Sequence, residues 1–187
     1  MHEMFFPLQN FFENRVKGNR IKFIMKQSGN NFAFIDAQNL NLSVKRLGWR
    51  LDYGRFRVYL REKYGVSKAY MFIGFMEEQS SLYRSLQEKG YILIFKPTLR
   101  HKDGTIKGNC DAELVLHAMI DYEAYQKAVV VIGDGDFHCL IRYLISKEKL
   151  EQVLIPDHAH YSALLKRFPS GFLAFISQLR SKLEFRP

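Results

Sequence analysis

The chain contains little cysteine and no long apolar run. Only two cysteines, Cys110 and Cys139, occur among its 187 residues, which argues against a disulfide framework and favours a reducing cytoplasm as the compartment. Both fall within predicted helices, where we expect them to pack. No apolar run approaches the roughly 20 residues that a membrane span needs, so a membrane protein is not expected.

Histidine patterns typical of zinc enzymes are also missing. The six histidines form neither an HxxxH nor an HExxH pattern. His158 and His160 follow the last predicted strand beside Asp157. They could approach a site at that strand end, but we predict that they are surface-loop residues.

Positive charge, by contrast, is in excess. The chain carries 28 Lys and Arg against 19 Asp and Glu, a formal net charge of +9. A basic surface suits a protein that binds a phosphate backbone, although a merely soluble basic protein would carry the same charge.

Residues 1–24 are apolar at the start and basic afterwards. Phe5 and Phe6 precede the first Arg or Lys, which is the reverse of a secretory signal. The apolar content predicts an N-terminal extension over residues 1–30 that packs as a helix or arm, either on its own domain or on a second subunit of a homodimer. Alternatively, Met25 is the natural start of the protein.

From Asn31 onward, apolar runs typical of buried strands alternate with helix-patterned segments. The alternation predicts one α/β domain over residues 31–187, a three-layer sandwich with a mainly parallel central sheet. The predicted strands are Phe32–Asp36, Ala69–Phe75, Tyr91–Phe95, Ala128–Ile132 and Gln152–Ile155. The predicted helices are Asp52–Tyr64, Glu77–Lys89, Asp111–Tyr125, Phe137–Ser146, Tyr161–Phe168 and Phe172–Leu183.

Three short polar motifs stand where predicted strands end or helices begin. They are Asp36-Ala37-Gln38-Asn39, Lys107-Gly108-Asn109-Cys110-Asp111 and Gly133-Asp134-Gly135-Asp136-Phe137. Open α/β sheets place their sites at the carboxyl ends of the strands, so we expect the four aspartates to converge there. Carboxylates without sulfur ligands suit a hard cation such as Mg²⁺ or Mn²⁺, which points to metal-dependent phosphodiester hydrolysis.

Simpler structural roles fit parts of this pattern. Asp111 extends the buried stripe of its predicted helix, but it would also serve as a helix N-cap. Gly133 and Gly135 let the backbone turn sharply, and a turn needs no catalysis. What the turn does not explain is the pair of aspartates, Asp134 and Asp136, which we expect to point into the crevice.

Other phosphate-handling folds match the motifs poorly. A dinucleotide fingerprint would need Gly where His138 stands. A haloacid-dehalogenase-type enzyme needs a second Asp two residues after the first, and Gln38 occupies that position. A topoisomerase-primase-type site needs Glu after its first strand, where this chain has Asp36.

Basic residues surround the Asp103-Gly104 turn that precedes the second motif. Lys96, Arg100, Lys102 and Lys107 are expected to form a basic flap that holds the phosphate backbone of RNA, although a Lys-rich hairpin can also be a solvated edge. The aromatics Trp49, Tyr53, Tyr70 and Tyr83 are candidates for base stacking, while most aromatics in the chain should be core.

The three motifs, in this order and strand context, resemble the NYN domain (LabA-like) family of the PIN-like nuclease superfamily, from about Asn31 to Phe175. The resemblance implies a compact α/β domain with a Mg²⁺- or Mn²⁺-dependent ribonuclease site. It assigns metal binding to Asp36, Asp111, Asp134 and Asp136, with Asn39 orienting a carboxylate or a bound water. Two positions depart from the family pattern: Ile132 stands where Ser or Thr is common, and His117 where many members carry another acid.

The expected function is therefore an endoribonuclease that hydrolyses RNA at an aspartate cluster, without a nucleophilic side chain. The alternative is a non-catalytic RNA-binding or regulatory scaffold module, because PIN-like folds also serve for binding.

Overall fold

The computed structural model describes residues 29–96, 99–100, 106–107 and 110–186. Residues 1–28, most of the predicted N-terminal extension, lie outside the described residues, and so does Lys102 of the predicted flap. The expectations of an arm and of a homodimer contact fall on that segment.

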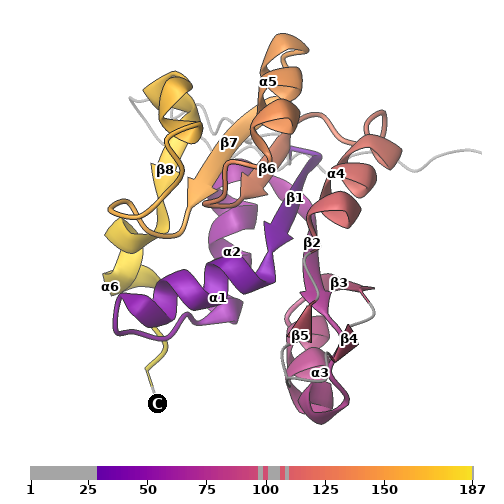
Figure 1. Ribbon diagram of the computed structural model, residues 1–187, viewed down its shortest axis with the longest axis vertical. Coiled ribbons are helices and arrows are strands. Elements are labelled where there is room, and N and C mark those ends of the chain that lie inside the picture. Colours follow the sequence, from indigo (N-terminus) through magenta and orange to yellow (C-terminus); the bar gives the residue numbers. More distant parts are fainter. Residues whose placement is uncertain (1–28, 97–98, 101–105, 108–109, 187) are drawn as a thin grey trace, which may run out of the picture.

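The centre of the protein is a six-stranded sheet in which every neighbouring pair is parallel (Figure 1). In spatial order its strands are β3 (Tyr91–Lys96), β2 (Val66–Gly74), β1 (Asn31–Asp36), β6 (Ala128–Val131), β7 (Leu150–Ile155) and β8 (Leu173–Phe175). A separate antiparallel hairpin pairs β4 (Leu99–Arg100) with β5 (Ile106–Lys107). The predicted parallel sheet is confirmed.

Helices cover both faces of the sheet because strand residues alternate between two apolar clusters. Ala33 and Ile35 face one cluster, and Phe32 and Phe34 face the other. The first cluster is completed by α1 (Ala37–Arg46), α2 (Tyr53–Tyr64), α3 (Ser80–Glu88) and the short α6 (Arg180–Leu183). The second is completed by α4 (Asp111–Ile120) and α5 (His138–Ser146). The result is the predicted three-layer sandwich.

The chain changes face between β1 and β6. The helix that follows β1 packs on one face, whereas the helix that follows β6 packs on the other. Such a topological switch point is where open α/β sheets bind ligands, and Asp36 ends the strand on one side of it.

Local capping fixes both ends of α2 as the sequence predicted. The Asp52 side chain accepts hydrogen bonds from the amides of Gly54 and Arg55 at 2.9 and 3.0 Å, which starts the helix. Gly65 ends it with a φ of 65°, a left-handed conformation that glycine adopts without strain.

The end of the chain differs from the prediction of two helical segments over Tyr161–Phe168 and Phe172–Leu183. Short 3₁₀ turns occur at Leu165–Arg167, Ser170–Phe172 and Ile176–Leu179, and the chain enters the sheet between the last two as the edge strand β8. Of the two predicted helices, only the four residues of α6 are α-helical. The prediction is wrong because a short apolar run fits a strand and a helix equally well, and the free edge of β7 decides for the strand.

Among the described residues, no helix is long and apolar enough to cross a membrane.

Candidate active site

Asp36 lies at the centre of the carboxyl edge, at the end of β1. Its Oδ1 accepts a hydrogen bond from the Asn39 amide at 2.9 Å, so the carboxylate also caps α1. The residue is half-buried. A functional carboxylate at this position is thus held by the first turn of the helix that follows it.

The pKa of Asp36 reports which charges surround it. Burial is the largest influence and raises this pKa, amide hydrogen bonds from Asn39 and Gln38 lower it, and repulsion from Asp111 and Asp134 raises it; together they move it from the ordinary 3.8 to about 6. Three of the four predicted aspartates therefore share one electrostatic environment.

Asp111 and Asp134 reach that environment from two different elements, the start of α4 and the end of β6. Asp111 is half-buried and is the first residue of α4, where Cys110 takes the N-cap position without a side-chain hydrogen bond. Its carboxylate is therefore not the cap that the simpler interpretation required. Asp134 follows β6 and is exposed.

Asp136, the fourth predicted ligand, takes a different position. It is exposed, its amide donates to Asp134 Oδ1 at 3.2 Å, and its charge is not among those that shift the pKa of Asp36. Its metal-binding role stays a prediction, without the electrostatic link to Asp36 that Asp111 and Asp134 have.

The two glycines of the third motif provide space rather than an unusual turn. Neither has a positive φ. A Cβ on Gly133 would stand 3.0 Å from Asn39 Oδ1, and a Cβ on Gly135 would overlap the Ser162 hydroxyl. Gly133 therefore lets Asn39 lie between the ends of β1 and β6, and Gly135 lets the loop after β7 close over the motif.

This packing predicts the effect of a methyl group at Gly135. Gly135→Ala should lower the free energy of unfolding by roughly 1 to 3 kcal/mol through overpacking, and Ser162→Gly in the same chain should recover part of that stability. Gly171→Ala is the matched control: a Cβ there meets nothing within 4 Å, so its stability should stay within about 0.5 kcal/mol of wild type. Urea denaturation measures all three, and equal stability of the two alanine variants would contradict this packing.

The donor set at the edge fits a hard cation in its chemistry. Three carboxylates come from neighbouring elements, and the buried Asn39 Oδ1 has no hydrogen-bond partner among the described residues. Carboxylate and amide oxygens are the ligands that Mg²⁺ and Mn²⁺ prefer. Across the described ranges, however, no three His, Cys, Asp or Glu side chains gather closely enough to form a complete metal site.

The predicted basic flap is described only in part. Lys96 Nζ lies 3.2 Å from Glu113 Oε2, so this lysine ties the end of β3 to α4. Arg100 and Lys107 lie in the paired strands β4 and β5.

Sequence reasoning missed a second anchored loop at the same edge. Asp157, directly after β7 and Pro156, is buried, and its Oδ2 lies 3.0 Å from His160 Nδ1. Burial acts to raise the pKa of Asp157, but bonds from the Ala159 amide and His160, with the charge of Arg46, lower it overall. The loop then meets the acidic motif, where the Ser162 amide donates to the Gly133 carbonyl at 3.0 Å. The sequence did contain a signal for this loop, because Asp157 closely follows the end of a predicted strand, just as Asp36 ends one.

Several other candidates prove to be packing residues. Trp49, Tyr70 and Tyr83 are buried, so only Tyr53 of the four proposed stacking aromatics remains partly accessible. His117 lies against the rings of Tyr70 and Phe72.

The cysteines do not pair, and only one of them packs as predicted. Cys110 is half-buried against the second apolar cluster, and burial with the nearby acids raises the pKa of its thiol to about 11. Cys139 is exposed, contrary to the prediction.

The parallel sheet, with acidic residues at its switch point, is that of a PIN-like α/β domain. More specifically, the NYN domain model matches residues 32–175, and the chain belongs to the NYN domain family. NYN domains are typically ribonucleases, so membership of the family supports a nuclease.

A solved structure shares the fold. The crystal structure of a protein of unknown function from Vibrio parahaemolyticus matches with a TM-score of 0.67 and 19% sequence identity, over 87% of this chain and 100% of that one. A search of the curated proteins found no significant match.

Proposed function

We propose that this protein is a Mg²⁺- or Mn²⁺-dependent endoribonuclease whose site is the acidic edge at the β1–β6 switch point. The observation that supports the proposal is that Asp36, Asp111 and Asp134 share one environment at this edge, where burial first, and then the charges of Asp111 and Asp134, raise the pKa of Asp36 to about 6. Clustered carboxylates with perturbed pKa values in a ligand-binding position are typical of functional sites.

Asp36, Asp111 and Asp134 would hold the cation, with Asp136 as a further candidate ligand. A bound divalent ion in such a site supplies a water of lowered pKa and a counter-charge for the phosphate.

The chain's own residues contribute position and charge. The Asp36 carboxylate is held by the hydrogen bond through which it caps α1, and the missing side chain of Gly133 leaves room for the Asn39 side-chain amide. The Cys110 thiol stays protonated at neutral pH because its pKa is raised, so it offers no thiolate nucleophile. Lys96, Arg100, Lys102 and Lys107 are proposed to contact the RNA backbone and give binding without base selectivity.

Non-catalytic RNA binding is the second candidate function. It is favoured by the lack of a complete three-residue metal group in the described part of the chain. A domain of this kind would keep the basic surface and the fold without cleaving RNA.

Incubation of the purified protein with end-labelled single-stranded and hairpin RNA separates the two functions. We expect internal cleavage with Mn²⁺ or Mg²⁺ and none with EDTA. RNA that is bound but stays intact with either metal would refute the enzyme and support the binding module.

A further inference from the structure

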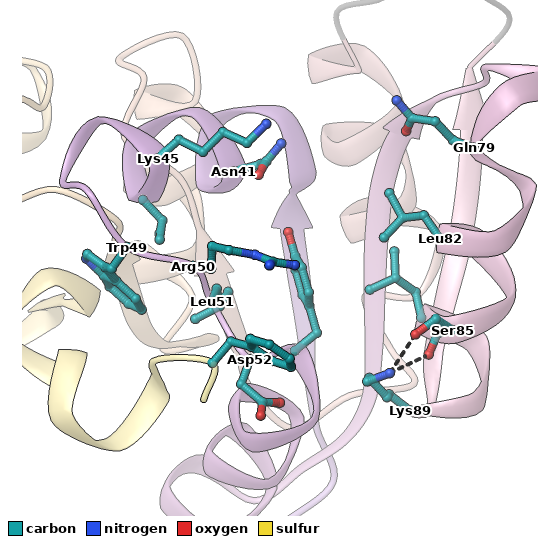
Figure 2. A pocket seen from close by; sticks show the side chains of 14 residues that line it. Asn41, Lys45, Trp49, Arg50, Leu51, Asp52, Gln79, Leu82, Ser85 and Lys89 are labelled. Atoms are coloured by element: carbon teal, nitrogen blue, oxygen red, sulfur yellow. Dashed lines mark hydrogen bonds between the residues drawn. The ribbon is translucent and has the colours of Figure 1, made fainter. Parts of the chain in front are cut away.

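A groove separates α1 from α3 on the face that carries the first apolar cluster (Figure 2). It consists of two adjoining hollows of about 510 and 250 Å³. Residues of both helices, including Asn41 and Leu82, line both hollows. The sizes are those of sites that take small ligands or part of a polymer.

One end of the groove lies at the candidate active site. The smaller hollow is lined by Ala37 and Gln38, which directly follow Asp36, and by Gly74 at the end of β2. β1 and β2 are paired neighbours, with Asp36 opposite Phe72. The groove therefore starts at the same edge of the sheet as the aspartates.

The other end is cationic. Lys45, Arg50 and Lys89 line the larger hollow, and in Figure 2 they extend from both of its walls. Within the described part of the chain, none of the three forms an ion pair with a carboxylate: Arg50 lies 5.0 Å from the ring centre of Phe185, and Lys89 Nζ donates to the Ser85 hydroxyl at 2.6 Å.

The acidic residue in the wall does not neutralise these charges. Asp52 Oδ1 accepts from two amides at the start of α2, and its Oδ2 lies 3.5 Å from Arg55 Nε. The groove is thus positively charged at the end where a ligand would arrive if it extended from the acidic edge along the groove.

We propose that this groove holds the single-stranded RNA that continues from the scissile phosphate, with Lys45, Arg50 and Lys89 against its backbone. The inference rests on the proposed function for the position of the scissile phosphate. Charge complementarity selects the occupant, because cations beside aromatic and amide side chains such as Tyr53 and Gln79 suit a flexible polyanion with exposed bases. An apolar protein segment would leave these cations unpaired.

RNA binding in Asp134→Asn protein with EDTA tests the groove without requiring cleavage. The groove variant adds Lys45→Ala/Arg50→Ala/Lys89→Ala to this background. The matched control adds Arg142→Ala/Lys147→Ala/Lys166→Ala instead, which removes the same charge from exposed positions in and near α5, on the other face of the sheet. Fluorescence anisotropy with a labelled oligouridylate at several salt concentrations measures affinity. Thermal melts establish that the variants are folded.

The groove variant should bind at least about tenfold more weakly at low salt. Its salt slope should fall by about 0.7 for each phosphate that the protein no longer neutralises, or about 2 in total. The control variant should keep most of the salt slope of the Asp134→Asn parent protein. An unchanged slope in the groove variant, or absence of RNA binding by the parent protein, overturns the proposal; the first result leaves a protein segment as the occupant. If wild type fails to cleave RNA while the groove variant shows the reduced slope, only the nuclease function is overturned.

Discussion

Asp134→Asn is expected to reduce metal-dependent RNA cleavage by roughly 100-fold or more, which corresponds to about 3 kcal/mol of transition-state stabilisation. The change removes one negative charge and keeps the shape of the side chain. Asp134 is exposed, and an asparagine oxygen can still accept the amide hydrogen bond from Asp136. The fold should therefore survive, and the reduced rate should come from the site itself.

The control for this prediction is Glu123→Gln, which removes a charge from an exposed turn after α4. Rates are measured with excess enzyme on end-labelled RNA, so that binding and chemistry separate. Full activity of Asp134→Asn, with the same metal requirement as wild type, would show that the cleaving site lies elsewhere.

Asp36→Asn is expected to make the metal-free protein more stable at neutral pH. The folded-state pKa of Asp36, about 6, lies above the ordinary value of 3.8. A raised carboxyl pKa contributes stability that is complete below about pH 4 and is lost as the pH rises through about 6. Asparagine caps α1 as well as aspartate does and carries no charge, so the variant avoids that loss.

The expected difference in unfolding free energy between variant and wild type grows by roughly 1 to 3 kcal/mol from pH 4 to pH 7. Urea denaturation in EDTA at both pH values measures it. Taking the difference between the two proteins cancels groups of opposite sign, such as Asp157, whose lowered pKa stabilises the fold at higher pH. A difference that does not change with pH would mean that neither burial nor the neighbouring carboxylates raise the pKa of Asp36 in the folded protein.

Most of the sheet could be predicted because its strands are short, apolar and bounded by clear stop signals such as Gly65. The sequence gives little indication of α1, since Asn39, Asn41 and Ser43 are weak helix formers and tertiary packing of Leu40 and Val44 decides the conformation. β8 could not be recognised because it is a strand only through its pairing with β7, which is separated from it in the sequence by a loop and two 3₁₀ turns. The local spacing of apolar residues does not show which strand a segment pairs with.

The site was predictable to the extent that it follows strand ends. That rule places Asp36 and Asp134 together, and the helix pattern adds Asp111. It does not distinguish Asp134 from Asp136, because two residues in one turn can point in different directions. It also gives no sign of Ser162, whose contact with Gly135 depends on how a distant loop returns to the edge.

Asp36, Asp111 and Asp134 are proposed to bind a divalent cation together. Thermal melts of the purified protein with EDTA and with millimolar Mn²⁺ test this binding most directly, because an ion that binds only the folded state raises the melting midpoint once its concentration exceeds its Kd. We predict that Mn²⁺ raises the midpoint of wild type, and that it leaves the midpoint of Asp36→Asn/Asp134→Asn unchanged. Identical midpoints of wild type with EDTA and with Mn²⁺ would contradict the account.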